Sequence, residues 1–497
     1  MTSPGESAVR LVFPGFKVGW DDPEDALRLA DLGVGGFCVY GGTVSEVAEF
    51  CRRVQERART PLLLCADYED GLASHVNGGT AFPSNMGLAA SNDESLAFEK
   101  GRLTALESRA VGIGWVLGPV VDLATQPLSP IVNIRSFGAD PGLVTRMARA
   151  AMKGLAAGGV LSCIKHFPGH GDSDLDSHLD LPLVEAPRDV LAGRELAPYA
   201  ALAAEADSVM VGHLAVPALS GDRRTPATMS EAVVSGELRG RLGFGGLVST
   251  DALSMHAVAK RYPELEASAS CLRAGCDIIL VPENPRQLAY DLIRLADSDP
   301  ATAGAVERSS RRLAEAMKTL EARQAACPPM DSGSVGCASH REAAARMAER
   351  CLAWGRPMEG VLPRTFAYFE PDEGFPGELH GKVFIEELKA LGFEPAAKAD
   401  AGAGETLVAG LFVSPRAYSG RISYASEELG RLKAAAARAS KTVAVAFGSP
   451  WALAGVPEAS ASLAAFSASA DAQRAAAAAL ARKLTVAGAL PVALDKR

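Results

Sequence analysis

The chain has 497 residues, of which 48% are apolar and 22% charged, and its 50 basic and 59 acidic side chains give a formal net charge of −9. This acidic balance argues against a nucleic-acid or membrane-surface partner, because affinity for polyanions comes from Lys and Arg side chains that neutralise phosphates. No run approaches the ~18 consecutive apolar residues of a membrane span, the first residues do not resemble a secretory leader, and the nine cysteines are scattered singly, so we expect a cytoplasmic protein.

Eight short apolar runs lie between the N-terminus and about residue 285, separated by segments with helical periodicity. Nearly continuous apolar runs bounded by Gly or Pro are typical of parallel strands that are covered on both faces. One helical segment, residues 140–159, starts with Asp-Pro and ends with Gly-Gly, which are helix start and stop signals. Eight β-then-α units predict an α/β fold with a (β/α)8 barrel of the TIM type over residues 1–325, and an open doubly wound sheet is the alternative. The expected strands occupy residues 10–16, 35–41, 61–69, 112–123, 160–167, 207–217, 245–251 and 276–283.

The last third of the chain has a different organisation. Residues 300–325 have a helical pattern, and the segment 326–342 is rich in Pro, Gly and Ser, which indicates a linker. We expect residues 343–497 to form a smaller α/β sandwich domain, in which Ala-rich helical stretches separate the strands. The apolar runs that suggest its strands are residues 365–371, 405–415, 441–450 and 489–494.

Ionisable side chains follow several of the expected barrel strands. In a parallel barrel the carboxyl ends of the strands meet over one mouth, where catalytic groups collect. A charge at the end of an apolar strand is costly unless it is paired or used. The barrel mouth is therefore the expected functional site, and the residues that end these strands are Asp67 and Glu69, Lys165 and His166, His213, and Asp251.

The densest polar segment is residues 165–184, with the sequence KHFPGHGDSDLDSHLDLPLV. Its alternating aspartates suggest a calcium loop, but an EF-hand needs Gly and Glu at the positions where Ser177 and Leu183 stand. A zinc site from His166, His170 and His178 is a second alternative, although their spacing fits no zinc-protease motif. A solvated acidic loop is a third.

The remaining interpretation of this segment is acid–base catalysis. Asp176 and His178 are two residues apart, so in an extended segment their side chains point the same way. A carboxylate beside an imidazole fixes its tautomer and favours its protonated form, which suits a general acid that later acts as a base. Asp251 suits an anionic nucleophile at the barrel mouth, with the N-cap of the following helix as its structural alternative.

Several of these motifs together resemble a known family. KHFPGHGD-x(3)-DSH, STDALSM, NIRSFGADP and MVGHLAVPAL followed by TPATMS are similar to the β-N-acetylglucosaminidase branch of the family 3 glycoside hydrolases. The match covers the whole barrel, and the second domain resembles the α/β sandwich that many family members append.

The resemblance implies a retaining hydrolase that removes terminal β-linked N-acetylglucosamine from muropeptide or chitooligosaccharide fragments. Asp251 would be the nucleophile, and His178, oriented by Asp176, the acid and base, in place of the two carboxyls of most retaining glycosidases. The resemblance also assigns Asp67, Arg135, Lys165 and His166 to the sugar, and Arg135 has a structural ion pair as its alternative. We expect the reaction to use a small carbohydrate substrate and no metal or other cofactor.

One segment departs from the family pattern. After the third strand the family usually reads D-x-E-G-G-R-V-x-R, whereas this chain has Leu72 and His75 at the positions of the two arginines. The substrate contact of the second arginine therefore does not carry over. The alternatives that stay open are a phosphorylase or a β-glucosidase of the same family, a metal hydrolase, and a catalytically idle sugar-binding barrel.

Overall fold

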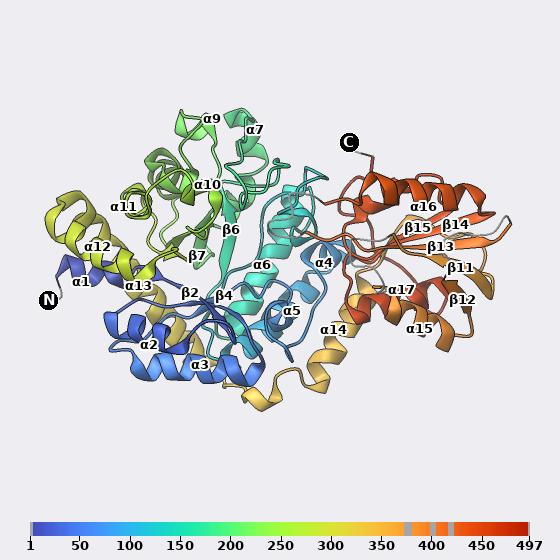
Figure 1. Ribbon diagram of the computed structural model, residues 1–497, viewed down its shortest axis with the longest axis horizontal. Coiled ribbons are helices and arrows are strands. Elements are labelled where there is room, and N and C mark those ends of the chain that lie inside the picture. The colour runs from blue at the N-terminus through green and yellow to red at the C-terminus, as the bar shows by residue number, and fades with distance from the viewer. Residues whose placement is uncertain (1–2, 372–379, 398–403, 416–421, 496–497) are drawn as a thin grey trace.

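The computed structural model of the protein describes residues 3–371, 380–397, 404–415 and 422–495. Its parallel strands form two units, a barrel in the first two thirds of the chain and an open sheet in the last third, which lie next to each other (Figure 1). The barrel strands are β1 (Val12–Phe13), β2 (Gly15–Val18), β3 (Cys38–Gly41), β4 (Cys65–Ala66), β5 (Trp115–Val116), β6 (Cys163–Phe167), β7 (Ser208–Val211), β8 (Leu247–Thr250) and β9 (Ile279–Leu280).

These strands close into a ring of eight, if β1 and β2 are counted as one strand that is interrupted at Pro14. The ring closes because β1 pairs in parallel with β9, and isolated parallel bridges join β5 to β6 and β8 to β9. Each strand falls within one of the apolar runs of the sequence, except that β2 extends two residues beyond its run to Val18, and the expected (β/α)8 barrel is confirmed. The carboxyl ends of all eight strands therefore open at one mouth.

The helices of the barrel begin and end where the sequence signals indicated. Asp140 caps α6 (Pro141–Ala157) by accepting from the Leu143 amide at 2.7 Å, and Gly158 ends it. Among the described residues, no helix is both long and apolar enough to cross a membrane. The other barrel helices are α1 (Pro4–Val9), α2 (Pro23–Leu32), α3 (Val44–Arg57), α4 (Asn85–Ser91), α5 (Glu94–Ala110), α7 (Arg188–Gly193), α8 (Ala197–Leu202), α9 (Pro217–Ser220), a π-helix (Ala232–Arg241), α10 (His256–Ala259), α11 (Glu264–Ala274), α12 (Pro285–Ser298) and α13 (Pro300–Ala326).

The second unit is a six-stranded sheet in the order β10-β15-β14-β13-β11-β12, parallel except for the β10–β15 pair. Helices α15 and α17 pack on one face of the sheet and α16 on the other, as expected for an α/β sandwich (Figure 1). Its elements are β10 (Ala353–Arg356), β11 (Thr365–Phe369), α15 (Lys382–Ala390), β12 (Glu394–Ala397), β13 (Thr406–Leu411), α16 (Ser426–Arg438), β14 (Lys441–Ala446), β15 (Ala461–Ala464) and α17 (Ala470–Leu480).

One expected strand of this unit is wrong. Residues 489–494, the run ALPVAL, form no strand, and the sheet includes three strands that the sequence did not indicate, Ala353–Arg356, Glu394–Ala397 and Ala461–Ala464. The physical reason is that Pro491 cannot donate to a sheet and the run lies against the barrel, where the Ala489 amide donates to the carbonyl of Ala90 and the Ala139 amide to the carbonyl of Pro491. The face of the sheet that α16 covers shares one apolar cluster with barrel residues Met86 and Ile131, so the two units have a continuous interface.

A buried carboxylate fastens the connection between the units to the barrel. Glu107 of α5 has no exposed side chain surface and accepts from the amide and hydroxyl of Thr80, from the amide of Gly336 and from Nδ1 of His340. Gly336 and His340 belong to the segment around the start of α14 (Ala338–Arg350). The hydrogen bond to Glu107 raises the pKa of His340, and the pKa of Glu107 is lowered despite its burial.

Replacing His340 with alanine should lower the free energy of unfolding by about 2 kcal/mol at pH 6, the usual worth of one hydrogen bond to a charged group. The pKa of His340 is raised in the folded state, so the stabilisation is fully present below the unfolded pKa of ~6.5 and is lost as pH rises through the folded pKa. Urea unfolding of both proteins at pH 6 and pH 9 should show a smaller difference at pH 9. His340→Gln keeps a donor without a charge, so its stability should differ from that of His340→Ala by the same amount at both pH values. An equal difference between wild type and His340→Ala at pH 6 and pH 9 would contradict the charged pair.

Candidate active site

A cavity of about 620 Å³ opens at the carboxyl ends of the barrel strands. The second unit reaches it through Pro415, which follows β13. Most of the residues singled out by the sequence line this one cavity, although they come from loops that are far apart along the chain. They are Asp67 after β4, Arg135 after β5, Lys165 and His166 in β6, His178 in the loop after β6, and Asp251 after β8.

Asp251 is placed by backbone contacts directly after β8. Its amide donates to the carbonyl of Val211, and its Oδ1 accepts from the amide of Ala252 at 2.8 Å. Burial alone would raise the pKa of Asp251, but the nearby imidazoles of His166 and His178 and the Ala252 amide hold it below its usual value. The group is therefore a carboxylate at neutral pH, which a nucleophile requires.

His213 has a supporting position rather than a place on the cavity wall. Its Nε2 lies 3.1 Å from the carbonyl of Ala252, which can only accept, so Nε2 carries the proton and donates. The Thr228 hydroxyl then donates to Nδ1, at 2.9 Å. Burial lowers the pKa of His213, which keeps the ring neutral. Its hydrogen bond to the Ala252 carbonyl holds the residue that follows Asp251.

Asp176 and His178 meet through a turn and not, as we expected, through an extended segment. The Oδ1 of Asp176 accepts from the His178 amide at 2.9 Å and lies 2.8 Å from Nδ1 of the imidazole. This side-chain-to-backbone bond two residues along is the geometry of an Asx turn, which short polar side chains favour in loops. Asp176 is fully buried behind His178, while His178 lines the cavity and is 22% exposed.

A cluster of paired charges forms another part of the wall. Lys165 Nζ lies 2.6 Å from Asp67 Oδ1 and 2.6 Å from Glu69 Oε1, and the guanidinium of Arg135 binds both oxygens of Glu69 at 2.9 and 2.7 Å. Burial alone would raise the pKa of Glu69, but the charges of Arg135 and Lys165 hold it well below its usual value. Arg135 thus forms the structural ion pair that was the alternative to sugar binding, and it also lines the cavity.

Asp122 is a site residue that the sequence interpretation missed. It is completely buried, and its Oδ2 accepts from the amide of His166 at 3.1 Å and lies 2.7 Å from His166 Nδ1, while its Oδ1 accepts from the amide of His170. Because Nδ1 is held by Asp122, the other ring nitrogen of His166 is available to the cavity. The signal was present in the sequence, since Asp122 ends the apolar run GPVVDL as Asp251 ends the run GGLVST.

The two residues at the positions of the family's arginines, Leu72 and His75, lie in different surroundings. Leu72 is fully buried in an apolar cluster and does not reach the cavity. His75 lines the cavity and packs edge-on against Tyr40, with their ring centroids 5.5 Å apart. Asp70, on the same loop, also lines the cavity and binds Lys100 Nζ at 2.8 Å. A carboxylate and an imidazole therefore stand in this part of the wall.

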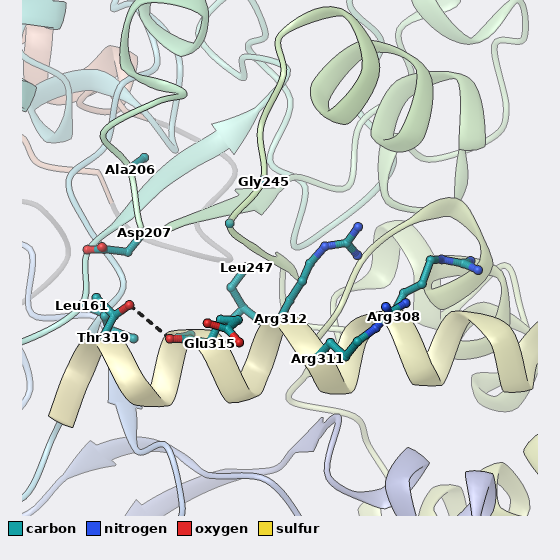
Figure 2. Close-up of a pocket in the computed structure, with 12 residues that line it drawn as sticks. Leu161, Ala206, Asp207, Gly245, Leu247, Arg308, Arg311, Arg312, Glu315 and Thr319 are labelled. Carbon is teal, nitrogen blue, oxygen red and sulfur yellow. Dashed lines mark hydrogen bonds between the residues drawn. The ribbon is translucent and has the colours of Figure 1, made fainter. Parts of the chain in front are cut away.

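A second cavity, also of about 620 Å³, lies at the opposite end of the barrel (Figure 2). It is bounded by α13 and by residues that precede β7 and β8, and Arg308, Arg311 and Arg312 of α13 line it. None of the residues predicted for the site is among those that line it. In the described ranges, no three His, Cys, Asp or Glu side chains are grouped so that they could hold a metal ion.

The fold and the mouth of the barrel define a class of protein. Residues 21–316 match the Glycosyl hydrolase family 3 N terminal domain, and the chain belongs to this family. The resemblance inferred from the sequence motifs is thus confirmed.

Two relatives are similar to this chain over more than two thirds of its length. The chain is 30% identical over 375 residues to Beta-hexosaminidase A of Pseudoalteromonas piscicida, an alignment that covers 69% of this chain and 62% of the relative. It is 30% identical over 392 residues to the Beta-N-acetylglucosaminidase/beta-glucosidase of Cellulomonas fimi, covering 76% of this chain and 67% of the relative. The chain thus spans about two thirds of the length of these two proteins.

Solved structures cover the chain more completely. A glycoside hydrolase family 3 beta-N-acetylglucosaminidase from Paenibacillus sp. str. FPU-7 superposes with a TM-score of 0.86 at 27% identity, over 99% of each chain. A structure named Beta-glucoside phosphorylase BglX bound to 2FGlc has a TM-score of 0.90 over 99% of this chain and 95% of its own, at 23% identity. The latter likeness concerns the fold alone.

Proposed function

We propose that this protein is a retaining glycoside hydrolase that removes terminal β-linked N-acetylglucosamine. The observation that carries the proposal is that one cavity holds an ionised carboxylate, Asp251, and an imidazole, His178, that a buried carboxylate orients. The names of the Cellulomonas and Paenibacillus proteins support the N-acetylated substrate. The proposed source of that substrate is muropeptide or chitooligosaccharide fragments in the cytoplasm, a compartment in keeping with the nine free cysteines.

The proposed mechanism is a double displacement. Asp251 attacks the anomeric carbon and the bond to the leaving oxygen breaks, while His178 gives its Nε2 proton to that oxygen. The covalent glycosyl-aspartate is then attacked by water, whose proton returns to His178, so that the carboxylate and the protonated imidazole are regenerated. Asp176 accepts from Nδ1 in both steps, which stabilises the positive charge that the ring carries before the first step and again after the second.

The charged cluster suits recognition of the sugar. Lys165 and Arg135 are fixed by Asp67 and Glu69, so their remaining N–H groups and the carboxylate oxygens that face the cavity have set directions. Sugar hydroxyls both donate and accept, and a site of fixed donors and acceptors binds them without reorganising during the reaction. The His166 ring, held by Asp122, adds a further polar group on the same side.

A second candidate is phosphorolysis at the same site. An imidazole does not repel an incoming phosphate dianion as a second carboxylate would, so phosphate could take the place of water. The experiment is to incubate the protein with 4-nitrophenyl N-acetyl-β-glucosaminide, with and without phosphate, and to identify the sugar product. We expect free N-acetylglucosamine in both cases. N-acetylglucosamine 1-phosphate would establish the phosphorylase, and faster cleavage of the plain glucoside would contradict the N-acetylated substrate.

A further inference from the structure

A cluster of arginines lines the cavity at the end of the barrel opposite the mouth (Figure 2). Arg308, Arg311 and Arg312 all belong to α13, and residues three and four positions apart lie on the same face of a helix. Like charges at these spacings destabilise a helix unless an opposite charge compensates them. The chain as a whole has a formal net charge of −9, so this cluster runs against the acidic balance of the molecule.

The acidic side chains in and behind the wall of this cavity already have cationic partners. Both oxygens of Asp207 bind the guanidinium of Arg323, at 2.7 Å each. Arg312 lies 2.9 Å from Oδ1 of the fully buried Asp277, so its charge is partly compensated. Glu315, which also lines the cavity, forms an ion pair with a lysine of the same helix. The charge that is left without compensation in the cavity is therefore positive.

Arg308 and Arg311 supply that positive charge. In the part of the chain that the structure describes, neither guanidinium has a hydrogen bond or an ion pair, and both residues are exposed. A guanidinium presents paired N–H donors in the geometry that phosphate oxygens accept. Two such groups one helical turn apart, with the remaining donors of Arg312 beside them, can bind one doubly charged phosphate group. The bound anion would also relieve the repulsion between the arginines.

The rest of the cavity indicates what the phosphate is attached to. The volume of about 620 Å³ is within the ~300–1,000 Å³ of sites for small organic molecules. Glu315 and Thr319 continue the same helix face, and the Thr319 hydroxyl donates to the carbonyl of Glu315 at 3.1 Å, so both side chains can accept from a ligand. None of the twelve described residues that line the cavity is aromatic, so no ring is present to stack on a nucleotide base. This lining suits the hydroxyls of a sugar.

We propose that this cavity binds a phosphorylated sugar. The phosphate group accepts from Arg308, Arg311 and Arg312, and the sugar hydroxyls donate to Glu315 and Thr319. The site lies at the opposite end of the barrel from the mouth, so its ligand is independent of the reaction proposed there. Bound between α13 and the residues that precede β7 and β8, the ligand stabilises the folded barrel, because a ligand that binds only the folded state shifts the unfolding equilibrium.

The test uses glucose 6-phosphate as the probe, titrated into the protein by calorimetry in a phosphate-free buffer of low ionic strength. We expect saturable binding of one equivalent and a midpoint of thermal unfolding that rises with the ligand concentration. Arg308→Gln with Arg311→Gln removes both unpaired charges, keeps good helix formers and should weaken the affinity at least about tenfold. Arg341→Gln with Arg346→Gln is the matched control. It removes two charges from exposed positions of α14, outside the cavity, and should leave the affinity within about twofold of wild type.

Several results would overturn the proposal. They are no saturable binding to the wild type, an unchanged affinity in Arg308→Gln with Arg311→Gln, and an equal loss in both double variants, which would assign binding to net charge alone. Displacement of glucose 6-phosphate by N-acetylglucosamine would place it at the mouth instead. Equal affinity for glucose would show that the phosphate is not recognised, and tighter binding of AMP would contradict the sugar.

Folding of the test variant is checked separately. Without ligand, Arg308→Gln with Arg311→Gln should unfold at the wild-type temperature or above, because neither arginine has a partner to lose and their mutual repulsion is relieved. A loss of affinity in this variant then reports the cavity and not a loss of structure.

Discussion

Replacing Asp251 with alanine should lower kcat by roughly 10⁴- to 10⁶-fold, as removal of a catalytic nucleophile does in other covalent enzymes. The carboxylate is ionised and accepts from the Ala252 amide, and the backbone amide of Asp251 donates to the Val211 carbonyl, so no other group of the site can take its place without moving. The loss should appear in release of 4-nitrophenol from the N-acetyl-β-glucosaminide under saturating substrate. Sugar binding, measured by calorimetry with N-acetylglucosamine, should change much less.

Two further measurements separate a nucleophile from a structural carboxylate. Azide added to the Asp251→Ala protein should restore cleavage and give the α-glycosyl azide, because the small anion attacks from the side where the carboxylate stood. Asp222→Ala, a change at an exposed loop aspartate that is hydrogen bonded to Thr225, is the matched control and should keep full activity. If Asp251→Ala retained wild-type turnover, Asp251 would not be the nucleophile. If instead the wild type cleaved no glycoside and this change left sugar affinity intact, the protein would be a sugar-binding barrel.

The barrel could be predicted because its strands are encoded locally. Each strand is a short apolar run between turn residues. Each pairs with the strands that come before and after it in the chain, so β3 lies between β2 and β4. The second domain was harder, since its strand Ala461–Ala464 has the sequence ASLA, whose composition does not distinguish strand from helix. The run ALPVAL has the composition of a strand but packs against the barrel, a choice made by tertiary contacts.

Prediction of the site likewise succeeded for locally encoded features and failed for long-range contacts. Groups at strand ends, such as Asp67 and Lys165, were recognised because the barrel topology places strand ends together. Their pairing was not, because Lys165 and Asp67 are 98 residues apart along the chain and Arg135 and Glu69 are 66 apart. Asp122 was missed for the same reason, since its partner His166 lies 44 residues away.

These long-range pairs also hold the charged side chains of the cavity wall in place. A buried lysine or carboxylate is stable in the folded protein only when an opposite charge compensates it. Lys165, 2% exposed, has two carboxylates, and Glu69, 12% exposed, has two cations. Removing one partner would leave a charge uncompensated, so changes here are expected to affect folding as well as sugar binding.

Replacing His178 with alanine should act on chemistry, and its effect should depend on the leaving group. For methyl N-acetyl-β-glucosaminide, whose alkoxide needs a proton to depart, kcat/KM should fall by about 10²- to 10⁴-fold, the usual contribution of a general acid. For the 2,4-dinitrophenyl glycoside, whose anion leaves without a proton, kcat/KM should stay within about tenfold of wild type. The midpoint of thermal unfolding should fall only slightly, since buried Asp176 loses the imidazole but still accepts from the backbone amide of residue 178.

Asp176→Asn tests the pair as a unit. The amide oxygen can still accept from the His178 backbone, so the turn is preserved, but the negative charge that favours the protonated ring is lost. This variant should resemble His178→Ala in its dependence on the leaving group, with a smaller loss on the methyl glycoside. In addition, the second step needs His178 as base, so the dinitrophenyl substrate should give a burst of phenol followed by slow turnover in His178→Ala. Equal losses on both glycosides, with no burst, would remove His178 from the proton transfer and leave the acid to another group at the mouth of the barrel.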